Sequence, residues 1–303
     1  MSKKVKQLVL PLITAVIWGT AFTAQKSGSG VIGAFTFNWT RYLLAALALA
    51  CFIAIRNKRA PKAAPQNKPA NRRALLCGGF VMGTLLMISS NLQQYGIGMT
   101  TAGKAGFITA LYIVLVPLFG LFLHKRVRLP VWIGVAVAVV GLYLLSFASD
   151  GKPTFTTGDL YVLPCALGFT FHILAIDHYT KRADSVELAC VQFAVAALES
   201  LIAGLIFEGV SWQAIQDCAV PILYAGLISG GVGYTLQVVA QKDGDPAIVS
   251  LLVSLEAVFA VLSGALILGE RLMPREYLGC LLMLLAVVLV QLPERKRPPA
   301  GQR

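Results

Sequence analysis

Amide and phenol side chains recur at helical spacing inside two apolar stretches of the chain. Asn91, Gln94 and Tyr95 follow the pattern i, i+3, i+4, so they lie on one face of a helix. Tyr234, Gln237 and Gln241 follow i, i+3, i+7 and share a face in the same way. Such neutral donors and acceptors could bind a polar metabolite without a permanent charge. The alternative is that they hydrogen-bond to each other across helices, which contributes about 1 kcal/mol each. We predict that the two faces line a cavity.

Two titratable residues lie deep inside apolar runs. An ionisable group at such depth is costly unless it is paired or faces a bundle interior or a wet cavity. His172 is a candidate for proton coupling or substrate contact, because an unperturbed imidazole titrates near neutrality; the alternative is a neutral histidine bonded to a neighbouring hydroxyl or carbonyl. Glu256 must be paired, protonated or functional. We predict that both are proton-coupling residues.

Two aromatic residues complete the set of candidate cavity residues. Trp18, in AVIWGTAF, lies in the middle of an apolar run rather than in an interfacial belt, so it either walls a cavity or packs between helices. Tyr112 brings a phenol into the fourth apolar run. The predicted substrate-cavity residues are Trp18, Asn91, Gln94, Tyr95, Tyr112, His172, Tyr234, Gln237 and Glu256.

The elements that must position these residues are membrane-spanning helices. Of the 303 residues, 57% are hydrophobic and 13% are charged, whereas an ordinary soluble domain is about 25% charged. Most of the apolar runs match the roughly 20 residues that cross a hydrocarbon core. We predict an all-α membrane protein with ten transmembrane helices, over residues 8–25, 35–55, 74–95, 105–123, 130–148, 159–176, 187–207, 219–240, 246–268 and 277–292.

The ten runs divide into two halves that resemble each other. A Leu-Gln pair, a short polar link and a second apolar run follow one another from Asn91 and again from Thr235. A doubled odd-numbered bundle must insert in opposite senses, which is typical of secondary transporters. We therefore predict two inverted five-helix repeats, residues 1–147 (spans 1–5) and 148–292 (spans 6–10), followed by a disordered basic tail, 293–303.

The net charge of +12 reports topology rather than a nucleic-acid partner. With a cytoplasmic N-terminus, most of the 26 Lys and Arg residues fall on the cytoplasmic side, so the positive-inside rule places both termini in the cytoplasm. No basic stretch alternates with base-stacking aromatics, and we expect no nucleic-acid binding. The basic residues expected on the outer side are Lys26, Arg41, Lys104, Lys152, Arg271 and Arg275.

Three of these cations are predicted at the outer ends of the first, second and fourth spans. Lys26, Arg41 and Lys104 have long side chains that can extend to the interface. The alternative is that they form an electropositive vestibule for an anionic solute. The six cysteines show no paired spacing, and we expect no metal site, no cofactor and no catalytic residue.

The chain resembles the drug/metabolite transporter superfamily in its ten-span EamA-type branch. The resemblance is carried by VIWGTAF in the first span, SLEAVFAVLSGALILGERL at the ninth and YLGCLLMLLAVVLV in the tenth, and it covers residues 8–292. It implies transport of small metabolites through a central cavity lined by the first, third, fourth, sixth, eighth and ninth spans.

From these observations we predict a secondary transporter, more specifically an exporter, of small polar metabolites such as amino acids. We expect it in the bacterial inner membrane as a monomer or homodimer, with proton coupling as the candidate energy source. One alternative is an integral-membrane enzyme acting on a lipid, for which Asp177, Asp184 and Glu187 are the nearest approach to an acidic cluster. A membrane scaffold is a third possibility, which fits polar faces inside a bundle poorly.

Overall fold

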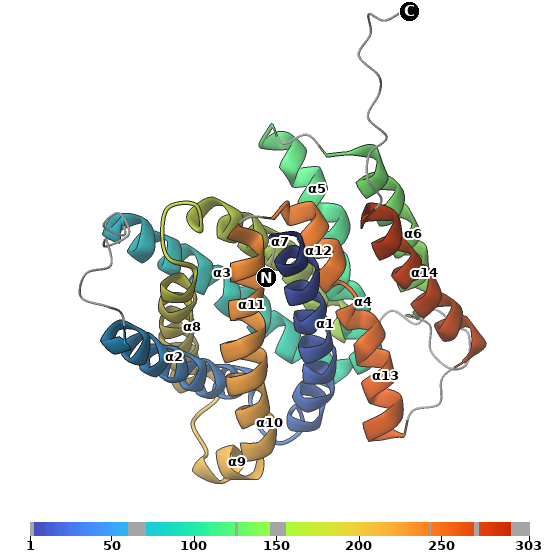
Figure 1. The fold of residues 1–303 in the computed structure, drawn as a ribbon. Coiled ribbons are helices and arrows are strands. Elements are labelled where there is room, and N and C mark those ends of the chain that lie inside the picture. Colours follow the sequence, from blue (N-terminus) through green and yellow to red (C-terminus); the bar gives the residue numbers. More distant parts are fainter. Residues whose placement is uncertain are drawn as a thin grey trace, which may run out of the picture.

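The computed structural model describes residues 3–59, 71–124, 127–145, 156–242, 244–269 and 273–291, and these ranges contain helices and no strand (Figure 1). Each predicted apolar run overlaps one helix or a series of consecutive helical segments. In the first half they are α1 (Lys3–Gly28), α2 (Ala34–Arg59), α3 (Arg72–Met99), α4 (Ala102–Ala110), α5 (Tyr112–Phe122) and α6 (Leu129–Leu145). In the second half they are α7 (Thr157–Tyr179), α8 (Ser185–Phe207), α9 (Trp212–Asp217), α10 (Ala219–Leu223), η1 (Tyr224–Tyr234), α11 (Thr235–Lys242), α12 (Pro246–Val253), α13 (Glu256–Leu268) and α14 (Pro274–Gln291).

Eight helical segments are long and apolar enough to cross a membrane. They comprise α1, α2, α3, α7 and α8, together with three composite segments built from α4 and α5, from α10 to α11, and from α12 and α13. Within the described residues, α6 is a shorter apolar helix and α14 falls outside this set. Large apolar side chains such as Phe80, Phe122 and Leu198 are more than half exposed, as expected where lipid is the solvent.

Two of the composite segments break at corresponding places. The first break is at Leu111, between α4 and α5, and the second is at Ser254 and Leu255, between α12 and α13. Both leave the next residue, Tyr112 or Glu256, at the start of a new helix. Matching Asn91 with Thr235, as in the repeat predicted from the sequence, also matches Tyr112 with Glu256.

Glycines allow helices from the two halves to approach closely. A Cβ atom added at Gly83 of α3 would lie 2.7 Å from the Gln192 carbonyl oxygen of α8, and one at Gly226 of η1 would lie 2.8 Å from the Arg41 carbonyl oxygen of α2. Thus α3 packs on α8, and the segment that corresponds to α3 in the second half packs on α2. These close approaches follow the small-xxx-small pattern of membrane helices.

The outermost helices also pair across the two halves. In Figure 1, α6 and α14 lie side by side at one edge of the bundle, with α2 and α8 toward the opposite edge. A Cβ atom added at Gly141 of α6 would lie 2.9 Å from the Gly279 carbonyl oxygen of α14. The central helices are therefore flanked by pairs that each contain one member from each half.

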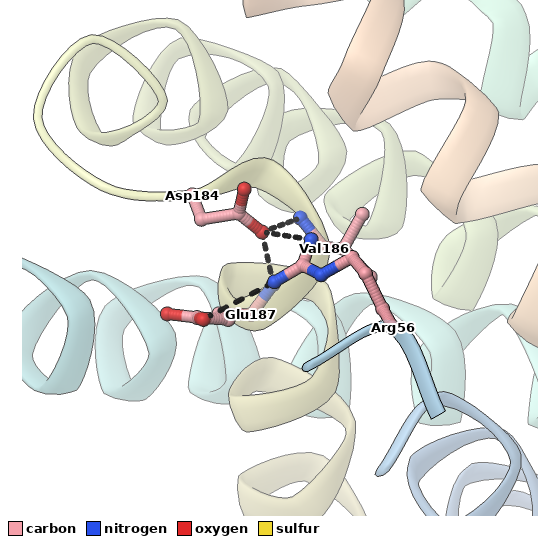
Figure 2. Close-up of polar contacts among 4 residues, drawn as sticks. All are labelled: Arg56, Asp184, Val186 and Glu187. Atoms are coloured by element: carbon pink, nitrogen blue, oxygen red, sulfur yellow. Dashed lines mark hydrogen bonds and ion pairs between the residues drawn. The ribbon is translucent and has the colours of Figure 1, made fainter. Parts of the chain in front are cut away.

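An ion-pair cluster joins α2 to the start of α8 (Figure 2). Arg56 lies 3.2 Å from Asp184 and 3.3 Å from Glu187, while Asp184 also accepts hydrogen bonds from the backbone N–H groups of Val186 and Glu187 as the N-cap of α8. Asp184 caps α8, and both Asp184 and Glu187 pair with Arg56, so both carboxylates have structural roles.

The predicted basic tail, residues 293–303, and Arg271 lie outside the described residues.

Candidate functional site

A cavity of about 30 Å³ lies between helices of both halves. Each of the six spans named from the family resemblance contributes to its wall, and α2 adds Arg41. A volume of this size has room for about one or two water molecules. Its lining consists of Trp18, Ala21, Phe22, Gln25, Arg41, Gln93, Thr109, Tyr112, Phe169, His172, Ile173, Ser229, Tyr234, Gln237 and Glu256.

The first helix of each half presents the same type of face to this cavity. On α1 the lining positions Trp18, Ala21 and Phe22 are spaced i, i+3, i+4, and α7 repeats that spacing with Phe169, His172 and Ile173. Residues at these spacings share one side of an α-helix. The aromatic residue that begins each series, Trp18 or Phe169, forms part of the cavity wall.

A hydrogen bond between two residues of the cavity wall joins the first half of the chain to the second. The phenol of Tyr112 donates to Oε1 of Glu256 over 2.9 Å, and both side chains are 2% exposed. Each residue begins the helix that follows a break. The bond therefore joins the two broken segments at their discontinuities.

His172 lies on the same wall and is held by an amide from α8. Its Nε2 is 3.0 Å from Oε1 of Gln192, and its ring meets Tyr234 edge-on with a centroid distance of 6.0 Å. Tyr234 also contacts Trp18, with ring centroids 4.3 Å apart. The indole N–H of Trp18 donates to the carbonyl of Ser229, over 3.3 Å, inside the π-helical segment η1. Departures of this kind from α-helical bonding often mark functional sites.

Arg41 was expected at the outer interface, and the structure places it in the cavity wall instead. The side chain is 3% exposed. Its guanidinium carbon lies 4.7 Å from the ring centroid of Tyr42 and 5.5 Å from that of Phe37, and Nη2 donates to the Tyr42 hydroxyl over 2.8 Å. Arg41 lies seven residues, or about 10 Å, beyond the first residue of α2. At this depth the guanidinium does not extend to the membrane interface.

The other two outer cations have structural partners, so no three-residue vestibule forms. Lys26 donates to the carbonyl oxygens of Ile97 and Thr100, at 2.9 and 2.8 Å, and so caps the C-terminal end of α3. Lys104 forms an ion pair with the buried Asp159, with 2.6 Å between Nζ and Oδ2. Both contacts tie helices of the bundle together.

Three of the predicted cavity residues lie outside the cavity in this structure. Asn91 bonds Asn38 and Ser200 at 2.8 and 3.1 Å, and Nε2 of Gln94 donates to the carbonyl of Gln25 over 3.1 Å. Tyr95 donates to Glu208 over 2.8 Å. These are hydrogen bonds between helices, as in the alternative to cavity lining, because this face of α3 turns toward α1, α2 and α8.

Several residues that line the cavity were not predicted from the sequence. One of them, Gln93, could have been predicted from its position in the repeat. It corresponds to Gln237 in the repeat, and both line the cavity. Gln93 donates to the hydroxyl of Thr109 over 3.1 Å. Gln25, Thr109 and Ser229 carried no such signal, because single polar residues are common in membrane helices and their facing depends on neighbouring helices.

The described residues contain no group of three or more His, Cys, Asp or Glu side chains that could hold a metal ion. Of the acidic residues considered for an enzyme, Asp184 and Glu187 bind Arg56, and Asp177 pairs with Lys181 at 3.1 Å. All three are thus accounted for by ion pairs in the part of the chain that the structure describes.

Comparisons with known proteins agree with this architecture. The model of the EamA-like transporter family matches residues 6–147 and 156–292. An uncharacterized transporter of Archaeoglobus fulgidus is 31% identical over 92% of this chain and 84% of its own length. The uncharacterized inner membrane transporter YedA of Escherichia coli strain K12 is 24% identical, with 94% and 92% covered. A protein of known crystal structure, 17% identical, shares the fold with a TM-score of 0.74 over 94% of this chain and 96% of that one.

The family match over nearly the whole chain, together with the multi-span helical bundle, places this protein in the transporter class of membrane proteins. The chain is a member of the EamA-like transporter family. One further relative, from Streptantibioticus cattleyicolor, is named "Probable terminal-alkyne amino-acid exporter" and is 27% identical over 77% of this chain and 75% of its own length.

Proposed function

We propose that this protein is a proton-coupled secondary exporter of small polar metabolites, with amino acids as the leading class, in a bacterial inner membrane. The observation that carries the proposal is the Tyr112–Glu256 hydrogen bond between two residues that line the cavity, which links the two halves through a titratable group. The amino-acid class is supported by the printed name of one relative, and the inner membrane by that of another. The family membership favours transport over the alternative of a lipid-modifying enzyme.

The same protein is proposed to have ten spans in two inverted repeats, residues 1–147 and 148–292. The exchanged packing supports this arrangement: α3 lies on α8, and its counterpart η1 lies on α2. The proposed fifth span of the first repeat, α6, packs against the proposed fifth span of the second, α14. Both the shorter α6 and the 18-residue α14 would then cross the bilayer with little tilt or with local thinning.

The cavity volumes support transport by alternating access. About 30 Å³ is too small for a metabolite, whose sites are typically ten times larger. A second cavity of about 370 Å³, lined in part by Val116, Pro117 and Ala247, begins one helical turn from Tyr112 along α5. With the predicted topology this larger cavity lies on the cytoplasmic side, where an exporter collects its substrate. Opening of the bundle between the two cavities would admit the substrate.

Topology can be tested with single introduced cysteines. Gly30, in the α1–α2 connection, is exposed with open space around it, and Lys58, near the end of α2, is also exposed. We expect Gly30→Cys to react with a membrane-impermeant thiol reagent in intact cells, and Lys58→Cys to react only after permeabilisation, because the basic residues mark the cytoplasmic side. The unmodified chain measures background from its own cysteines. The reverse pattern would invert the proposed orientation.

Transport itself is tested by amino-acid counterflow in proteoliposomes that contain the full chain. The wild type should exchange a labelled amino acid from a mixed panel. Gln237→Ala, which removes a cavity amide, should reduce the rate about tenfold, whereas Gln94→Ala, which removes an interhelical bond worth about 1 kcal/mol, should mainly lower stability. Initial rates, normalised to folded protein, provide the measurement.

Two results would contradict the proposal in different ways. Absence of counterflow for every amino acid would remove amino acids as the substrate class. Equal rates for wild type and Gln237→Ala, with a lower rate for Gln94→Ala, would place the substrate path along the opposite face of α3 rather than in the cavity.

A further inference from the structure

The cavity contains a buried cation that has no ionic partner. Arg41 is 3% exposed, and among the described residues no carboxylate forms an ion pair with it. The carboxylate that shares the cavity, Glu256, accepts its printed hydrogen bond from Tyr112. An unpaired charge inside a membrane protein is costly and is retained where it serves function.

Hydrogen-bonding atoms without partners occur on three residues that line this cavity. Nε of Arg41 is a buried donor with no acceptor, and Oε1 of Gln25 and Oε1 of Gln237 are buried acceptors with no donor. They come from α2, α1 and α11, so they converge from three different elements. Leaving such groups unpaired is unfavourable, and a bound molecule could supply the missing hydrogen bonds.

The complementary molecule has an anionic acceptor at one end and a donor at the other. A guanidinium presents several N–H groups in a planar fork that matches a carboxylate, and Nη2 of Arg41 is already oriented by the Tyr42 hydroxyl. Amide oxygens accept hydrogen bonds from an ammonium group. The aromatic rings of Phe37 and Tyr42 hold the guanidinium in place from within its own helix.

We propose that Arg41 anchors the carboxylate of a zwitterionic amino acid, while the side-chain oxygens of Gln25 and Gln237 receive its ammonium group. This inference rests on the proposed function and adds to it the orientation of the substrate and the residue that selects it. The cavity must widen before such a molecule fits, and the cation and the amide oxygens supply the contacts that favour the widened state.

The test uses three probes that differ only in their charged ends. Leucine carries both groups, 3-methylbutylamine lacks the carboxylate, and 4-methylpentanoate lacks the ammonium. Binding of each to the purified full chain is measured by calorimetry and by the shift in apparent Tm. We expect the wild type to bind leucine at least about tenfold more tightly than either single-ended probe, because each missing end leaves buried groups unpaired.

Two variants test the carboxylate contact and the ammonium contact of the proposed site one at a time. Arg41→Gln should weaken leucine and 4-methylpentanoate about 30-fold and leave 3-methylbutylamine unchanged, because only the carboxylate contact is lost. Gln237→Leu should weaken leucine and the amine but not the acid. Arg56→Gln is the matched control, since it removes a cation from the same helix at a partly exposed ion pair. Binding of the amine by Arg41→Gln that is as tight as in the wild type or tighter also shows that this variant is folded.

The outcomes distinguish this inference from the proposed function. Leucine binding that is equal in wild type, Arg41→Gln and Arg56→Gln overturns the assignment of Arg41 while the transporter proposal stands. Tighter binding of either single-ended probe than of leucine overturns the zwitterion. A wild type that neither binds nor exchanges any amino acid overturns both. Arg41→Lys keeps the positive charge but loses the planar guanidinium. Its affinity for leucine should therefore lie between those of the wild type and Arg41→Gln.

Discussion

Replacement of Glu256 by Gln should abolish the response of transport to a pH gradient. An exporter driven by proton entry moves substrate toward the acidic compartment, so acid-loaded proteoliposomes of the wild type should accumulate amino acid. One pH unit is worth about 1.4 kcal/mol per proton, or about a tenfold concentration ratio. Gln keeps an oxygen for the Tyr112 hydroxyl but cannot release a proton, so the accumulation ratio should fall to about one while binding persists.

His172→Gln tests the second candidate, and Glu199→Gln serves as a membrane-embedded control. Glu199 accepts from Thr84 over 2.7 Å on α8 and does not line the cavity, so its neutralisation should leave the accumulation ratio unchanged. The ratio is measured with a radiolabelled amino acid at a fixed imposed gradient. Wild-type transport that ignores the gradient would assign Glu256 and His172 to structural hydrogen bonds and would favour facilitated diffusion or exchange.

A single methyl group at Gly19 should destabilise the bundle at its centre. A Cβ atom there would lie 2.3 Å from Cβ of Phe259 and 2.7 Å from the carbonyl oxygen of Glu256, so α1 and α13 could not keep their present separation. Overpacking of this kind costs about 1–3 kcal/mol, or more where backbone must move. Alanine gains up to about 1 kcal/mol in helix propensity, which the clash outweighs. We expect a fall of several degrees in apparent Tm.

Gly106→Ala provides the matched control for this prediction. Gly106 of α4 also faces α13, but its added Cβ would lie 3.5 Å from Cβ of Ala260, an ordinary contact. The variant should therefore equal or exceed the wild type in apparent Tm, since only the propensity gain remains. If both variants melt at the wild-type temperature, α1 does not pack on α13 as closely as described.

The helical architecture could be predicted because lipid imposes it on the sequence. Without water in the bilayer core, every backbone group must bond within its own helix, so hydropathy alone located the helical runs. The predicted substrate role of the cavity residues stays a prediction. Six of the predicted residues line the cavity: Trp18, Tyr112, His172, Tyr234, Gln237 and Glu256.

The amino-acid sequence by itself determined which segments are helices and that polar groups such as His172 and Glu256 are buried among apolar ones, and it predicted the correspondence of the two halves. Only the tertiary structure decided what those groups face. Asn91 and Gln94 bind neighbouring helices, whereas Gln93 and Arg41 line the cavity. The physical reason is that hydropathy reports the depth of a residue in the membrane, while the rotation of each helix depends on close packing with partners far away in the chain, such as that of Gly226 on Arg41.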